Sequence, residues 1–549
     1  MLKYDVLVIG SGAGGLIAAI KAAKNGLRVL IIEKRHEYGG STAMSGGTVW
    51  VPNCHVSKKM GFQDSFEDGL IYMETVIGEE GPWTSRERKI AYIENINEIM
   101  LELETEGIEW VPAKYYPDYY PELPGGKNGG RSIDASFFDK RRLGDWANHL
   151  HTMGIKTPFP IHSGEVGHIP KMLRRSEDFW KMGKIVLRSI PWQISGKKYA
   201  SNGQTLIAHL MYIALKYDVD VWLNTSFEKF NVENDQVKGI TCLKDGEEIL
   251  LHADSVIVAA GGFSHNKFLR QKYHNIGTDW SSANPENTGD VILQGMELGA
   301  DMALLDDAWW GPATVKPDGE RLFILSERSV PHTIIVDQDG NRFFNESASY
   351  IDAGHSMLEH NNHSPAIPSW MIMDGRHRNR FMFQTILPFM TPKELINEGF
   401  FIKAKTIEEL AEKCKIPPQK LKDTIERFNG FVKKGVDEDF GRGNSKYDNY
   451  YGDPTYKNPN LGAIDKAPFW AVRIYPGDLG TKGGFITDVH GRVLKDEEPI
   501  GGLYATGNST ASVMGRTYPG AGSTLGPTMA FGYAAAKHIL SERSLLEKN

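Results

Sequence analysis

A glycine-rich turn near the N-terminus constrains this chain more than any other feature of its sequence. Gly10, Ser11, Gly12, Ala13, Gly14 and Gly15 fit the pattern G-x-G-x-x-G. The turn follows an apolar, β-branched segment, residues 4–9, and precedes a segment of small residues, 15–24, after which residues 28–33 are again largely apolar. This order predicts a strand, a turn, a helix and a second strand, the βαβ unit typical of dinucleotide-binding proteins.

Each glycine of the pattern has a physical role in such a site. Gly10 makes the tight turn, Gly12 lets the backbone approach a pyrophosphate, and Gly15 packs the helix against the strand. The helix N-terminus offers unpaired N–H groups to the phosphates. Glu33 ends the second predicted strand, where a carboxylate binds ribose hydroxyls and repels a 2′-phosphate. These residues alone are consistent with either NAD or FAD.

The composition is that of a globular protein with more than one domain. The chain has 549 residues, and its 58 glycines gather in clusters, which indicates backbone lying close to a ligand. A net charge of −7 gives no reason to expect nucleic acid as a partner. Cys54, Cys242 and Cys414 are too widely spaced for a disulfide framework or a zinc site, so we expect no metal. No apolar run reaches the length of about 18 residues that spans a membrane, and we expect a cytoplasmic protein.

Three further segments resemble the flavin-contacting segments of the fumarate reductase and succinate dehydrogenase flavoprotein superfamily. They are GGSTAMSGG at residues 39–47, VIVAAGGF at 256–263 and GGLYATGN at 501–508. The resemblance implies FAD. Members with covalent flavin carry a histidine where this chain has Ser41, so FAD is expected to bind non-covalently. The residues expected to bind it are Gly10, Ser11, Gly12, Ala13, Gly14, Gly15, Glu33, Lys34, Gly40, Ser41, Thr42, Ser45, Gly46, Gly47, Ala260, Gly261, Asp290, Asn508 and Leu525.

The C-terminal glycine segment separates this chain from the dicarboxylate enzymes of that superfamily. Those enzymes typically show H-G-x-N-R-x-G-G, whereas this chain has TYPGAGSTLGP at residues 517–527, with no arginine to hold a carboxylate. Together with YPDYYPELPGG at 116–126 and RFFNESASY at 342–350, this segment resembles the signature of the 3-oxosteroid 1-dehydrogenases.

The resemblance implies roles for four residues. Oxidising the bond beside a ketone removes a proton from carbon 2 and a hydride from carbon 1, and donors aimed at the ketone oxygen lower the barrier. The Tyr518 hydroxyl and the Gly522 N–H are the implied donors, and Tyr350 is the implied base, assisted by Tyr119. The hydride passes to flavin N5. A Tyr119–Tyr350 hydrogen bond that favours the phenolate is our hypothesis.

Without the resemblance, these tyrosines would be interpreted as packing residues. Tyr119 stands in a Pro- and Gly-rich loop, and Tyr350 follows a strand-like run at 332–344. Trp309 and Trp310 are candidates for lining an apolar substrate cavity, or for the core.

We predict an α/β fold with a Rossmann-like FAD-binding domain at residues 1–290 and 477–549. An α+β substrate domain is inserted at 291–476. Residues 395–435 have a helical pattern with a capping box at 406–409 and no dinucleotide signal.

Residues 165–200 are rich in Lys and Arg, with Phe179, Met182, Val186 and Ile190 at near-helical spacing. A basic amphipathic helix of this kind is typical of a peripheral membrane contact. The interpretation we favour is a solvated helix that covers the mouth of the substrate site. The nearby His151, His162 and His168 match no metal motif.

The predicted function is FAD-dependent 1,2-dehydrogenation of 3-oxosteroids in steroid degradation, with electrons passed to an acceptor of unspecified chemistry. One alternative is a related reaction in the same fold, either 4,5-dehydrogenation of a 3-oxosteroid or reduction of an enone. The other is a non-catalytic protein that binds flavin or steroid.

Overall fold

The βαβ unit predicted at the N-terminus is confirmed. The computed structural model describes residues 2–152, 159–168, 171 and 174–546. It begins with β1 (Leu2–Ile9), α1 (Ala13–Lys24) and β2 (Val29–Ile32). β1 pairs in parallel with β2 on one edge and with β9 (Glu247–Val258) on the other. Segments from distant parts of the sequence therefore form one sheet.

This larger sheet has 8 strands in the order β18-β19-β8-β9-β1-β2-β6, with β7 paired to β8. Besides those already given, its strands are β6 (Asp220–Trp222), β7 (Thr225–Glu233), β8 (Gln236–Lys244), β18 (Arg492–Lys495) and β19 (Glu498–Ala505). β19 also pairs in parallel with β9. β9, β1, β2 and β6 are thus parallel, as the Rossmann-like prediction requires, whereas β8 pairs antiparallel with both β9 and β7.

Both faces of the parallel strands are buried. Val6 and Val8 of β1 point into a core shared with α1, α5 (Arg86–Thr105), α8 (Gly203–Lys216) and α17 (Leu525–Leu546). Leu7 and Ile9 point to the other face and pack with residues of β7 and β8. This alternation explains why the strands are apolar throughout, since neither face meets water.

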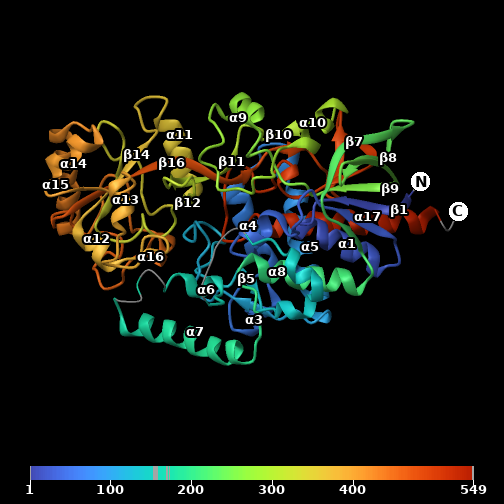
Figure 1. The fold of residues 1–549 in the computed structure, drawn as a ribbon, viewed down its shortest axis with the longest axis horizontal. Coiled ribbons are helices and arrows are strands. Elements are labelled where there is room, and N and C mark those ends of the chain that lie inside the picture. The colour runs from blue at the N-terminus through green and yellow to red at the C-terminus, as the bar shows by residue number, and fades with distance from the viewer. Residues whose placement is uncertain (1, 153–158, 169–170, 172–173, 547–549) are drawn as a thin grey trace.

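A second sheet has 6 strands in the order β12-β11-β16-β14-β13, with β15 paired to β16. They are β11 (Ala308–Val315), β12 (Arg321–Phe323), β13 (Thr333–Val336), β14 (Ser369–Met373), β15 (Ile402–Ala404) and β16 (Phe469–Thr481). All its pairings are antiparallel. The two sheets lie at opposite ends of the molecule, with β11 and β16 extending between them (Figure 1).

The helices predicted in residues 395–435 are confirmed and cover one face of the second sheet. They are α14 (Ile407–Cys414) and α15 (Pro418–Lys434), and Thr406 caps the first by accepting a hydrogen bond from Glu409 N at 3.1 Å. α11 (Tyr350–His360) packs against the other face. β16 crosses the predicted domain limit at 476, and the limits at 290 and 476 stay a prediction.

The remaining strands have two to four residues, and the remaining α-helices have four to twelve residues except for one of 19. The strands are β3 (Val49–Trp50), β4 (Trp110–Pro112), β5 (Ser132–Ala135), β10 (Met302–Ala303) and β17 (Gly484–Phe485). The helices are α2 (Gly40–Met44), α3 (His55–Lys59), α4 (Phe66–Ile77), α6 (Ser163–Val166), α7 (Ser176–Ile194), α9 (Lys267–His274), α10 (Asp290–Glu297), α12 (Gly375–Arg380), α13 (Lys393–Asn397) and α16 (Lys446–Tyr451). α7, the helical segment predicted within 165–200, lies along one edge of the molecule (Figure 1). Among the described helices, none has both the length and the apolar character needed to cross a membrane.

Candidate functional site

A single large cavity contains almost every residue predicted to have a function. It has a volume of about 2120 Å³ and extends from the glycine turn to the second sheet. All the predicted FAD-binding residues except Gly15 line it, and so do Tyr119, Tyr350, Tyr518 and Gly522. The fold therefore brings segments from both ends and the middle of the sequence to one place.

The glycine turn leaves room only for hydrogen at Gly10, Gly14 and Gly15, and a Cβ at Gly14 would lie 2.8 Å from the carbonyl oxygen of Thr528. Gly10 has φ +104°, and a Cβ there would lie 2.4 Å from the carbonyl oxygen of Ala259. A Cβ at Gly15 would lie 2.1 Å from the carbonyl oxygen of Gly10, so only glycine fits there, and Gly15 does not belong to the cavity lining. Gly12 is the N-cap of α1 and has no side chain to occupy the N–H groups of the first turn, as a phosphate site needs.

Glu33 is held beside the turn in the position expected for a ribose ligand. Its Oε2 accepts hydrogen bonds from Ser11 N at 3.1 Å and from Ser11 Oγ at 2.5 Å. The Ser11 hydroxyl in turn accepts one from Gly39 N at 3.0 Å. Lys34 lies at the cavity wall, where its Nζ donates to Thr288 Oγ1 and Asp290 Oδ2. The residues at this end fit the adenosine and pyrophosphate of FAD.

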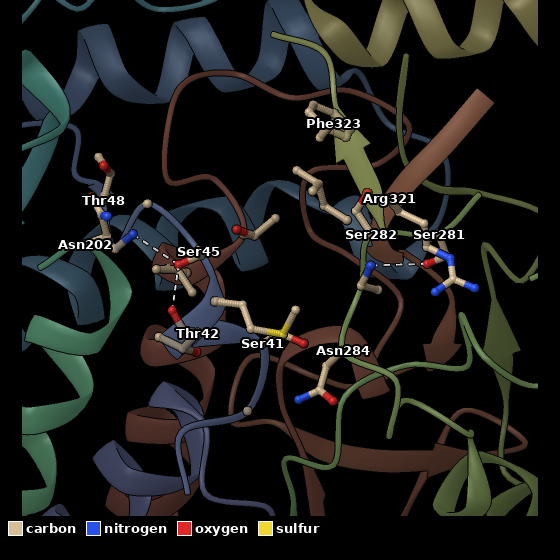
Figure 2. A pocket seen from close by; sticks show the side chains of 18 of the residues that line it. Ser41, Thr42, Ser45, Thr48, Asn202, Ser281, Ser282, Asn284, Arg321 and Phe323 are labelled. Carbon is tan, nitrogen blue, oxygen red and sulfur yellow. Dashed lines mark hydrogen bonds between the residues drawn. The ribbon is translucent and has the colours of Figure 1, made fainter. Parts of the chain in front are cut away.

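The second glycine cluster lies next to the turn and is tied together through hydroxyl groups. Ser45 Oγ donates to Thr42 O at 2.7 Å and accepts from Gly47 N at 3.0 Å. Ser41 Oγ accepts from Asn287 Nδ2 at 3.3 Å. Figure 2 shows Thr42 and Ser45 on one side of the pocket, with Ser281, Ser282 and Arg321 on the other. This cluster and the opposing wall can hold a flat ring system between them.

The three predicted catalytic tyrosines meet beyond this cluster. Tyr119 stacks on Tyr518 with ring centroids 5.0 Å apart, and the centroids of Tyr350 and Tyr518 are also 5.0 Å apart. Tyr119 and Tyr350 meet edge to face at 5.5 Å. All three rings are buried, at 4 to 5% exposure.

The loop between β19 and α17 carries Tyr518 and Gly522 and is fixed by its neighbours. The carbonyl oxygen of Pro519 accepts hydrogen bonds from Tyr72 Oη at 2.7 Å and from Tyr119 N at 2.9 Å. Gly522 has φ +101°, and a Cβ there would lie 2.4 Å from the backbone nitrogen of Trp50. Only glycine suits this close approach of two backbones.

The electrostatics of the tyrosines differ from our hypothesis. The described hydrogen bonds include none between Tyr119 and Tyr350, whose rings meet edge to face instead. Burial raises the pKa of Tyr350 well above its usual range, and the neighbouring Tyr518 raises it further. Burial also raises the pKa of Tyr518, but donors that include Tyr350 and the Gly522 N–H oppose the rise. The cause is an apolar cavity wall that disfavours phenolate.

Further tyrosines that the sequence did not single out complete this cluster. Tyr116 Oη and Tyr451 Oη are 2.6 Å apart, and the Tyr447 ring lies 4.3 Å from that of Tyr119. The tyrosine-rich run at 447–451 is the sequence feature from which Tyr447 and Tyr451 could have been predicted. Trp309 and Trp310 are buried and do not belong to the described lining, so the core interpretation is correct for both.

Comparison with known proteins agrees with this geometry. The model of the FAD binding domain family matches residues 5–525. The chain belongs to this family of flavin oxidoreductases, and its cofactor is FAD.

Relatives of similar length have named activities. A 3-oxosteroid 1-dehydrogenase of Mycolicibacterium smegmatis is 42% identical, covering 100% of this chain and 99% of its own. A 4-oxocyclohexanecarboxylate 2-dehydrogenase of Sinomonas cyclohexanicum is 32% identical, covering 98% of this chain and 93% of its own. The crystal structure of a 3-ketosteroid delta1-dehydrogenase from Sterolibacterium denitrificans with 1,4-androstadiene-3,17-dione is 35% identical, with a TM-score of 0.92 over 99% of this chain and 100% of that one.

Proposed function

We propose that this protein uses FAD to introduce a double bond between carbons 1 and 2 of a 3-oxosteroid. The observation that carries the proposal is the meeting of Tyr119, Tyr350, Tyr518 and Gly522 in the cavity that also holds the flavin-contacting segments. The named activities of the relatives support the same reaction.

Tyr518 and Gly522 bind the ketone oxygen in this proposal. Both lie on the loop between β19 and α17 and line the cavity, so they offer the ketone a hydroxyl and a backbone N–H without a charged side chain. As the proton leaves carbon 2, the ketone oxygen becomes an enolate, and the two donors stabilise it. One donor of this type contributes about 10²- to 10³-fold in rate.

Tyr350 removes the proton from carbon 2. Since burial raises the pKa of this phenol, it is protonated in the steroid-free protein near neutral pH and must lose its proton before it can act. Tyr119 contacts both Tyr350 and Tyr518 through its ring and is the residue placed to assist that transfer.

The cofactor is bound by the chain without a covalent bond. When bound, FAD would supply the redox chemistry, as the acceptor at N5 for the hydride that leaves carbon 1. The turn at Gly10 and the start of α1 would hold the pyrophosphate, and Glu33 would hold a ribose. Ser41 stands where covalent members have histidine.

Anaerobic flavin reduction tests the proposal. Tyr518→Phe and Tyr350→Phe should each retain FAD and reduce it at least about 100-fold more slowly with a saturated 3-oxosteroid. Mass spectrometry and NMR of the product should show a carbon 1–carbon 2 double bond. A carbon 4–carbon 5 double bond would support the alternative reaction, and a steroid that binds without bleaching the flavin would indicate a non-catalytic protein.

We also propose that α7 contacts an anionic lipid surface through which steroid reaches the cavity. Trp180 and Ile194 are 66% and 82% exposed, and Phe179 and Leu187 are 57% and 63% exposed while also lining the cavity. Lys184, Lys197 and Lys198 are exposed on or just after the same helix. Exposed apolar side chains with basic neighbours are typical of an interfacial helix.

Flotation with anionic vesicles tests this contact. A variant with Phe179→Ser, Trp180→Ser and Leu187→Ser should lose flotation. Phe268→Ser is the matched control, because Phe268 on α9 is 66% exposed and distant in sequence from α7. Equal flotation of the wild-type protein and the triple variant would support the solvated helix instead.

A further inference from the structure

Lys482 is a buried cation at the back of the loop that carries Tyr518. It follows directly after β16, and its side chain is fully buried. Its Nζ donates to the carbonyl oxygens of Gly515 and Thr517, each at 2.7 Å. Thr517 precedes Tyr518, so the ammonium fixes the peptide from which the tyrosine extends. Burying an ammonium group costs free energy unless its N–H donors form hydrogen bonds. Lys482 forms two of these hydrogen bonds with this loop.

The same ammonium also supports the ring next to Tyr518. Its Nζ lies 4.3 Å from the ring centroid of Trp309, within the range of a cation–π contact. Trp309 meets the Tyr518 ring edge to face at 5.2 Å, and its Nε1 donates to Asn508 Oδ1 at 3.0 Å. Asn508 lines the cavity among the residues expected to bind FAD. Lys482 thus contacts both the backbone before Tyr518 and the indole beside it.

Asp307 keeps a negative charge beside this cation. Its Oδ2 lies 3.7 Å from Lys482 Nζ, while its Oδ1 accepts from Trp310 Nε1 at 2.9 Å and lies 2.8 Å from His355 Nε2. Burial lowers the pKa of Lys482 to about 8, and Asp307 opposes that change. The aspartate is held by its own partners, so the hydrogen bonds of Lys482 remain directed to the tyrosine loop.

We propose that Lys482 is a positioning residue for Tyr518: by holding the carbonyl groups of Gly515 and Thr517 and the ring of Trp309, it sets where the tyrosine hydroxyl meets the ketone oxygen. This inference rests on the proposed function, in which Tyr518 is one of the two donors. Displacement of a reacting group by about 1 Å costs about 100-fold in rate.

A double-mutant cycle tests this role. Lys482→Met keeps the length of the side chain but removes the donors, and it should slow anaerobic flavin reduction by about 10- to 100-fold with KM changed less than about threefold. In a Tyr518→Phe background, Lys482→Met should slow reduction by less than about twofold, because the hydroxyl it positions is already absent. The matched control is Lys89→Met, since Lys89 is likewise buried and donates to the carbonyl of Gly78 at the end of α4. It should reduce its flavin at the wild-type rate.

The outcomes separate this inference from the proposed function. The positioning role would be wrong if Lys482→Met reduced its flavin at the wild-type rate, or if it lost the same factor in both backgrounds. In either case, a slow Tyr518→Phe enzyme would still support the proposed function. A Tyr518→Phe enzyme of full rate would overturn both. Should Lys482→Met not retain FAD, Lys482→Gln, which keeps two N–H donors, takes its place. A smaller loss that disappears in the Tyr518→Phe background supports the proposal, and a loss of the same size in both backgrounds refutes it.

Discussion

Gly522→Ala tests most directly whether close backbone packing at the site sets the rate of flavin reduction. A Cβ at this position would lie 2.4 Å from the backbone nitrogen of Trp50 and 2.6 Å from the carbonyl oxygen of Thr48. Both contacts are with backbone atoms, Trp50 N in β3 and Thr48 O just before it, and backbone atoms cannot rotate away as a side chain can. Ordinary contacts begin near 3.4 Å. The loop must therefore retreat by about 1 Å, a displacement that costs about 100-fold when it separates reacting groups.

The assay is anaerobic stopped-flow bleaching of the bound flavin at saturating 3-oxosteroid. The variant should contain FAD and bleach about 100-fold more slowly than the wild type, and the strained backbone should lower its free energy of unfolding by about 1–3 kcal/mol. Gly430→Ala is the control, because Gly430 lies in α15 and a Cβ there meets no atom within 4 Å. It should keep the wild-type rate and gain about 0.5–1 kcal/mol. A Gly522→Ala protein that bleaches at the wild-type rate would refute the reasoning.

Three further predictions concern the tyrosines and the cofactor. The rate constant for flavin reduction should rise about tenfold per pH unit up to pH 10, because Tyr350 acts as a phenolate and burial holds its pKa above the usual range; a plateau already at pH 8 in stopped-flow measurements would contradict this. Tyr119→Phe should slow reduction less than Tyr350→Phe does, since its ring still stacks on Tyr518; a larger loss would identify Tyr119 as the base. Glu33→Gln should weaken FAD binding by about 10- to 100-fold in a fluorescence titration of apoprotein, and an unchanged Kd would exclude a ribose contact.

The fold was predictable where the signals are local. The glycine turn and the capped helix at Ile407–Cys414 depend on residues close in sequence, and both are confirmed. Without the resemblance, Tyr350 would be interpreted as an aromatic residue after the strand-like run at 332–344, but it begins α11. The strand stops at Val336 because the segment Asp337-Gln-Asp-Gly-Asn341 forms a turn, with Asp337 N donating to Asn341 O and Gly340 at φ +87°. The turn-forming residues at 337–341 therefore end the strand inside the run at 332–344, although the run as a whole favours a strand.

The site was predictable only in part. Resemblance indicated Tyr119, Tyr350 and Tyr518, because they stand in compact motifs. Lys482 and Tyr447 lie in no such motif, and their contacts depend on how β16 and α16 pack against loops distant in sequence. A lysine is ordinarily interpreted as a surface residue, and its burial is decided by tertiary structure alone.

The pairing of β1 with β9, and of β9 with β19, determines when during synthesis the FAD site can form. β1 can pair with β9 only after β9 has been synthesised. β19 can join the sheet only after Ala505 has left the ribosome. Long-range parallel pairing of this kind folds slowly and leaves apolar strands uncovered meanwhile. The N-terminal glycine turn is thus translated first, but its contacts with Ala259 after β9 and with Thr506 after β19 form later. A supply of free FAD would then act as a folding ligand, because it binds only the finished sheet and draws late intermediates toward the native state.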